Sequence, residues 1–133
     1  MRSPGRLVVY SVAGFAFEVA FSALHDAVRS RPVRCRTSPL MLSVYALLLP
    51  LFEPVHDRLR GRPLPVRATV YGLGFLGVEY VSGRVFRRAW GDAPWDYSYA
   101  PRHLHGLIRP DYFFLWALAG LLCEPLHDAL TER

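Results

Sequence analysis

Lysine is absent from this 133-residue sequence, although the chain carries sixteen basic residues and a formal net charge of +5. Every basic side chain is therefore an arginine, a bias that genome composition explains more simply than a guanidinium-specific role. Cysteine is also scarce. Cys35 lies in an arginine-rich stretch and Cys123 in an apolar run, so the sequence indicates no disulfide framework. The length predicts a single domain, residues 1–133.

Two further signals are missing. The first apolar run has no small-residue cleavage site and carries Glu18, so we interpret it as a retained helix and not as a removed signal peptide. Residues 41–52 and 113–122 lack the polar face that a helix of a soluble bundle needs at every turn or so. These absences favour a membrane protein over a soluble bundle.

The sequence contains four apolar runs, residues 7–24, 40–55, 68–86 and 112–126. Each has about 15–19 residues, which is close to the length of a membrane-spanning helix. Arginines gather between the runs, which is more typical of loops flanking membrane spans than of a nucleic-acid surface. We therefore predict an all-α, polytopic bundle of four transmembrane helices. The expected partner is the lipid bilayer of a bacterial inner membrane, with no nucleic acid, and self-association into a homo-oligomer is left open.

The sequence also contains a repeated pentapeptide. Glu53-Pro54-Val55-His56-Asp57 recurs seventy-one positions later as Glu124-Pro125-Leu126-His127-Asp128, and each copy closes an apolar run. Val9-Tyr10 precedes Glu18 by the same interval as Val70-Tyr71 precedes Glu79. The bundle is therefore predicted to consist of two helical hairpins, residues 7–59 and 68–130.

Each of the four runs carries one glutamate, and a carboxylate inside a membrane span needs a partner or a water-filled cavity. At about 1.5 Å per residue the four glutamates fall at similar depth. One Glu from each of two helices and Glu-x-x-His from the other two is the ligand set of di-iron and di-manganese carboxylate bundles. The predicted metal ligands are Glu18, Glu53, His56, Glu79, Glu124 and His127.

The expected cofactor of this site is a divalent metal, with iron or manganese favoured and zinc a further candidate. The same residues allow a metal-free interpretation. The glutamates could carry protons or ions, as in a transporter, or hold the helices together through hydrogen bonds, as in a scaffolding membrane component. Catalytic residues and a substrate are not indicated by the sequence, which leaves open whether the protein is an enzyme.

One glycine motif resembles a nucleotide fingerprint without its context. Gly72-Leu73-Gly74-Phe75-Leu76-Gly77 matches the spacing of a dinucleotide-binding loop, but no strand precedes it. Small residues that let helices approach closely are the better interpretation. No nucleotide-binding motif is therefore expected in this chain.

Several stretches together resemble known families. Trp95-Asp96-Tyr97-Ser98, Gly106-Leu107-Ile108 and the aromatic run with Trp116 resemble the transmembrane protein 229 family and the bacterial membrane proteins labelled putative ABC-transporter type IV, or CmpB-like. Further matching stretches are Phe15-Ala16-Phe17-Glu18, residues 59–62 and Val78-Glu79-Tyr80. The resemblance implies a small polytopic membrane protein whose glutamates belong to the family pattern, whereas His56 and His127 depart from it.

Overall fold

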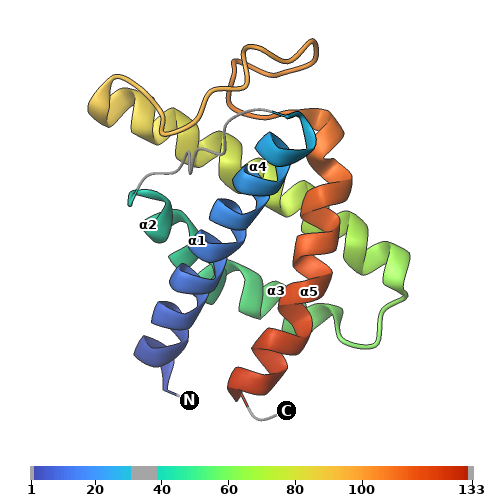
Figure 1. Ribbon diagram of the computed structural model, residues 1–133. Coiled ribbons are helices and arrows are strands. Elements are labelled where there is room, and N and C mark those ends of the chain that lie inside the picture. The colour runs from blue at the N-terminus through green and yellow to red at the C-terminus, as the bar shows by residue number, and fades with distance from the viewer. Residues whose placement is uncertain (1, 31–38, 132–133) are drawn as a thin grey trace. The chain divides into compact units, whose positions relative to one another are not determined.

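The computed structural model describes residues 2–30 and 39–131, which are largely helical (Figure 1). In this part of the chain, helices are joined by turns and loops. Leu104 and Ile108 form an isolated antiparallel bridge that does not extend into a pair of strands. The all-α prediction is confirmed. The chain divides into two compact units, Met1–Leu51 and Phe52–Arg133, and each is considered by itself.

The first unit contains α1 (Ser3–Val28) and α2 (Met41–Ala46), which pack against each other. α1 begins with Pro4 in its first turn, where the missing N–H of proline has no cost. Gly14 lies directly under the Tyr45 ring, so any side chain at position 14 would collide with that ring. The first unit therefore depends on a glycine for the close approach of its helices.

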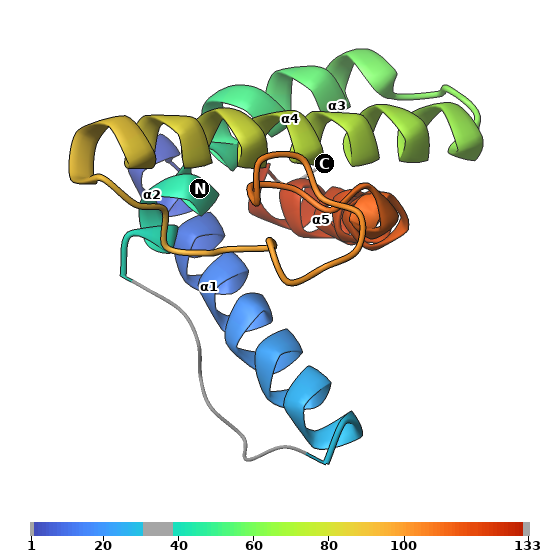
Figure 2. The same cartoon turned by 90° about the horizontal axis from the view of Figure 1, so that it is seen from above.

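The second unit contains α3 (Glu53–Leu59), α4 (Leu64–Trp90), a single 3-10 turn η2 (Pro110–Tyr112) and α5 (Phe113–Thr131). A π-helical turn, η1 (Leu48–Phe52), leads into α3. α4 stops at Gly91, whose φ of +81° is the left-handed conformation that ends many helices and favours glycine. Seen from above, α4 runs across the nearly end-on α5 (Figure 2).

α4 and α5 cross where small residues allow it. A Cβ atom on Gly120 of α5 would clash with the Cβ atom of Tyr71 on α4, and one on Gly72 would lie 2.5 Å from the Phe113 ring. The expectation that the glycines of residues 72–77 serve helix packing is thus confirmed at Gly72 but wrong at Gly74 and Gly77, which have open space around them. Because Glu124 follows Gly120 by one helical turn, the crossing also places Glu124 beside Tyr71.

The connection between α4 and η2 is folded back on itself. The Tyr97 N–H donates to the Gly106 carbonyl at 2.8 Å, and the Trp95 indole N–H donates to the Leu107 carbonyl at 2.9 Å. Leu107 is fully buried and rests on Gly83 of α4, where an added Cβ would come within 2.6 Å of its side chain. This loop is therefore part of the packed second unit.

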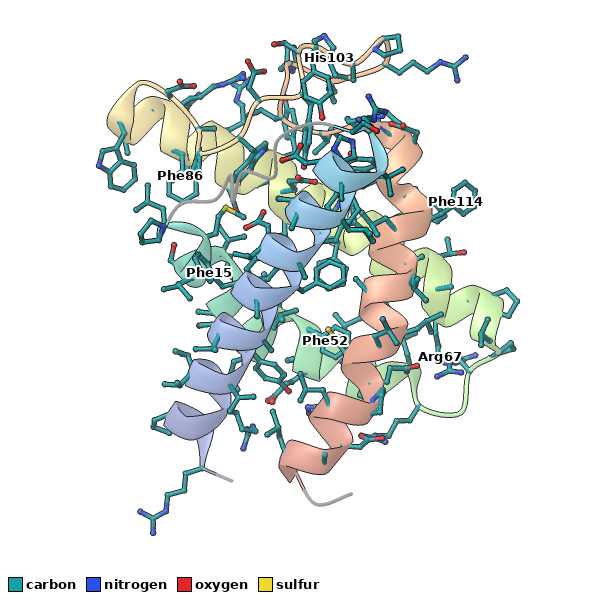
Figure 3. The ribbon with its side chains drawn as sticks, in the orientation of Figure 1. Phe15, Phe52, Arg67, Phe86, His103 and Phe114 are labelled. Atoms are coloured by element: carbon teal, nitrogen blue, oxygen red, sulfur yellow. The ribbon has the colours of Figure 1, made fainter. Side chains whose placement is uncertain are left out.

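Among residues 2–30 and 39–131, two helical segments are long and apolar enough to cross a membrane, Ser3–Val28 and Pro110–Thr131. On α5, Phe114 points away from the helix and is 78% exposed, as a lipid-facing side chain would be (Figure 3). The second predicted run is divided among α2, η1 and α3, and α4 carries Glu79 and several arginines, so neither passes this test. The four-span bundle of two hairpins remains a prediction.

Candidate functional site

Both copies of the repeated pentapeptide lie in the second unit, at the start of α3 and near the end of α5. Pro54 occupies the first turn of α3, where its ring is tolerated, directly after the π-helical turn. Pro125 lies inside α5 and cannot donate to the carbonyl of Leu121. The proline thus has a different effect on the backbone in each copy, while the following His is buried in both.

Each histidine is paired with the glutamate of the other copy. His56 Nδ1 lies 3.0 Å from Glu124 Oε2, and His127 Nδ1 lies 3.3 Å from Glu53 Oε1. His56 is 3% exposed and His127 2%, so both pairs are shielded from solvent. The two halves of the repeat are therefore joined by an exchange of partners between α3 and α5.

The aspartates repeat this exchange on the other ring nitrogen. His56 Nε2 lies 3.5 Å from Asp128 Oδ1, and His127 Nε2 lies 3.4 Å from Asp57 Oδ1. The two imidazole rings meet edge to face, with centroids 5.2 Å apart and planes at 88°. We call this pseudo-symmetric group the His–carboxylate cluster; it comprises Glu53, His56, Asp57, Glu124, His127 and Asp128.

Tyr71 determines where the proton of His56 lies. The Tyr71 hydroxyl donates to Glu124 Oε2 at 2.9 Å, so its oxygen can only accept from His56 Nδ1 at 2.8 Å. A neutral His56 then carries its proton on Nδ1 and a lone pair on Nε2. Within the described chain, His56 Nε2 is buried and has no hydrogen-bond partner; Asp128 Oδ1, at 3.5 Å, is an acceptor as this nitrogen is, so neither donates to the other. Such an atom is costly unless something binds it.

Two arginines border the cluster. Arg67 reaches from α4 toward α5 (Figure 3), and its Nη1 donates to both oxygens of Glu124, at 2.5 Å and 2.8 Å. Arg60, which follows α3, donates through Nη2 to Asp128 and lies 3.4 Å from Asp57 through Nε. The hydrogen bond with Asp128 raises the pKa of Arg60, so this side chain stays charged.

Of the six predicted ligands, the structure brings four together: Glu53, His56, Glu124 and His127. Glu79 lies elsewhere in the second unit, eight residues beyond Tyr71 and so about 12 Å further along α4. Its Oε1 accepts from the Tyr97 hydroxyl at 2.7 Å and its Oε2 from the Trp116 indole at 3.0 Å. Glu18 belongs to α1 of the first unit.

The sequence analysis did not single out five side chains of this region: Asp57, Asp128, Arg60, Arg67 and Tyr71. The Asp57 and Asp128 side chains are 40% and 32% exposed, yet their oxygens face the buried imidazoles. For Arg67 and Tyr71 a signal was present in the sequence. The spacing between Arg67, Tyr71 and Glu79 is the same as the spacing between Arg6, Tyr10 and Glu18. The Arg-Tyr-Glu pattern therefore occurs once in each half of the chain.

One group of potential metal ligands stands out among the described residues. His56, His127 and Asp128 each offer one ligand atom, and these atoms lie within 4.8 Å of one another. Two imidazole nitrogens and a carboxylate oxygen form a donor set that suits zinc and divalent iron. Glu124 and Glu53 contact the Nδ1 atoms, which is where carboxylates that orient metal-bound histidines are found.

The fold and the cluster together define an all-helical protein with two membrane-compatible helices and a buried set of histidines and carboxylates. Residues 6–133 match the family described as Putative ABC-transporter type IV (CmpB), and the chain belongs to that family. The resemblance to the transmembrane protein 229 family remains a prediction. Searches of curated proteins and of solved structures gave no match.

Proposed function

We propose that this chain is an integral membrane protein that binds one divalent metal ion in the His–carboxylate cluster, through His56 Nε2, His127 Nε2 and Asp128. The observation that carries the proposal is the buried His56 Nε2, which has no hydrogen-bond partner within the described residues. His56 is also one of the three residues whose ligand atoms lie within 4.8 Å of one another. Carboxylates by themselves do not indicate a bound metal. A buried imidazole nitrogen with an unused lone pair next to a carboxylate does, because both are metal ligands.

The surroundings of the histidines support the same assignment. Glu124 with Tyr71 occupies the Nδ1 side of His56, and Glu53 occupies the Nδ1 side of His127. Both Nε2 atoms are thereby directed toward aspartates, Asp128 and Asp57. Carboxylate–histidine–metal arrangements of this kind hold the ring and its tautomer, and their loss lowers metal affinity by about 10–100-fold.

The proposal alters the ligand set predicted from the sequence. Glu53 and Glu124 become partners of the ligating histidines, and Asp128 becomes a ligand. The role of Glu18 and Glu79 as metal ligands remains a hypothesis from the sequence and is not part of the proposed one-ion site. For Glu79, the two hydrogen bonds from Tyr97 and Trp116 favour a structural role.

The proposal is tested by elemental analysis of the purified protein after exposure to iron, manganese and zinc and removal of excess metal. We expect one ion per chain in the natural protein and a loss of at least about tenfold in affinity for His56→Ala and Asp128→Asn. His105→Ala is the matched control, because His105 is an exposed histidine whose ring contacts Tyr80.

Circular dichroism of each variant separates loss of metal from loss of folding. Absence of stoichiometric metal from the natural protein would overturn the proposal. Equal metal content in folded His56→Ala and His105→Ala would do the same, because the ion would then be bound elsewhere.

A metal-free proton or ion pathway is the second candidate. The observation that favours it is the continuous chain of polar contacts from Arg67 through Glu124 and Tyr71 to His56. In reconstituted liposomes, this candidate predicts a proton-coupled flux that disappears in Glu124→Gln and persists in Asp92→Asn. Retained flux in Glu124→Gln would exclude it.

A further inference from the structure

We infer that Arg60 limits the cluster to a single metal ion by occupying the place of a second cation. The inference rests on the proposed function. It starts from the symmetry of the cluster, because Glu53 and Glu124 lie on the Nδ1 sides of the histidines and each Nε2 atom then faces one aspartate. Two such pairs of an imidazole nitrogen and a carboxylate correspond to two divalent ions.

Arg60 lies between the two halves of this donor set. Its Nη2 donates to Asp128 and its Nε lies 3.4 Å from Asp57. These two carboxylates are the ones that face the Nε2 atoms of the histidines, Asp128 toward His56 and Asp57 toward His127. One guanidinium therefore binds both of the carboxylates that would otherwise each serve one ion.

The repeat shows that this arginine is an asymmetric addition. Counting from the two copies of the pentapeptide, the position that corresponds to Arg60 is Thr131. The Thr131 hydroxyl donates to the backbone carbonyl of His127 at 2.8 Å, so it neutralises no carboxylate. The cation that binds the two aspartates thus comes from one copy of the repeat only, while Arg67 of α4 binds Glu124 on the Nδ1 side of His56.

The guanidinium of Arg60 keeps its positive charge at all relevant pH values, because an arginine side chain does not lose its proton in proteins. It can therefore take the place of a metal cation beside the carboxylates. The first ion has both histidine nitrogens to offset this charge, whereas a second ion at Asp57 would have no further imidazole, and repulsion from Arg60 and from the first ion would oppose its binding. Arg60 therefore determines the stoichiometry of the site, whereas the histidines determine that a metal binds at all.

The test is Arg60→Thr, which gives the first half of the cluster the residue that the second half already has. We expect the metal content to rise from about one to about two ions per chain, the two lying close together as in other two-metal sites. Arg62→Thr is the control, since Arg62 lies in the same exposed turn and should keep the content of the natural protein. In manganese-loaded samples, electron paramagnetic resonance should change from the signal of an isolated ion to that of a spin-coupled pair.

Each outcome decides something different. A natural protein without metal would refute the proposed function itself. Natural protein and Arg60→Thr that both bind one ion would overturn the role of Arg60 and leave the proposed function intact. An Arg60→Thr variant that binds none would also overturn it, because Arg60 would then be needed to position Asp128. If Arg60→Thr fails to fold, Arg60→Gln keeps the length of the side chain and is read in the same way.

Discussion

His56 and His127 meet edge to face at 5.2 Å, and each is paired with the glutamate and the aspartate that accompany the other. Neither copy of the pentapeptide therefore forms a complete site by itself. The local sequence places Glu and His three residues apart on one helix, but the contacts run between helices. A complete set of partners for either histidine therefore requires both copies of the motif.

Tyr71→Phe should weaken metal binding with little loss of folding. The substitution removes the hydroxyl that accepts from His56 Nδ1 and donates to Glu124. The imidazole ring then loses a contact that keeps its proton on Nδ1 and leaves Nε2 available to the metal. We expect about a tenfold fall in affinity, measured by competition with a coloured chelator. Tyr80→Phe removes an exposed hydroxyl that contacts His105 and is the control. Equal affinities of the two variants would contradict the assigned role of Tyr71.

Glu79→Gln should destabilise the second unit. The natural carboxylate accepts from both Tyr97 and Trp116, whereas a glutamine amide offers one acceptor and turns an N–H group toward the other donor. The expected cost is about 1–3 kcal/mol in the free energy of unfolding. Thermal unfolding in detergent measures it, together with a shift in tryptophan emission.

The control for this substitution is Asp92→Asn, because Asp92 is exposed and accepts from the neighbouring Ala93 N–H. A Glu79→Gln variant as stable as Asp92→Asn would show that the contacts to Tyr97 and Trp116 contribute little.

Gly120→Ala should disturb the crossing of α4 and α5. The added methyl group would collide with the Cβ atom of Tyr71, which lies next to the backbone and cannot swing away. Overpacking of this kind costs about 1–3 kcal/mol, and we expect a lower midpoint of thermal unfolding. Gly74→Ala has open space around it and should be neutral or gain the helix propensity of alanine. A Gly120→Ala variant that unfolds no earlier than Gly74→Ala would refute this crossing geometry.

The loop between α4 and η2 should loosen at acidic pH through Asp96. The Ser98 backbone N–H and hydroxyl donate to the Asp96 carboxylate and lower its pKa below the ordinary value of 3.8. A lowered pKa means that the stabilisation is present above pH 3.8 and is lost as the pH falls through the lower value of the folded state. Amide hydrogen exchange of the loop should therefore accelerate below that pH.

Asp96→Asn isolates this effect, because other carboxylates titrate in the same range. The difference in exchange between natural protein and variant should be constant above pH 3.8 and shrink below it. A difference that does not depend on pH would contradict the role of the Asp96 carboxylate.

The helices could be predicted from the sequence because their signals are local. Three of the four apolar runs coincide with helices: α1 and α4 extend beyond the predicted bounds at both ends, and α5 begins one residue later and ends five residues later than predicted. Less predictable was the second run, where Pro50 and Pro54 lie within and just after a π-helical turn that separates α2 from α3. The effect of a proline on a helix depends on its position in a turn, which apolar periodicity does not reveal.

The sequence by itself determined the helical class, the repeat and the family, and it singled out four of the six residues of the cluster. Only the tertiary structure decided which carboxylate meets which histidine, and that Arg60, Arg67 and Tyr71 belong to the site. The physical reason is the crossing of α4 and α5 at Gly120, which brings Tyr71 and Arg67 to Glu124 across more than fifty residues of chain. Glu79 lies two helical turns beyond Tyr71 along α4, although all the glutamates follow one pattern in the sequence.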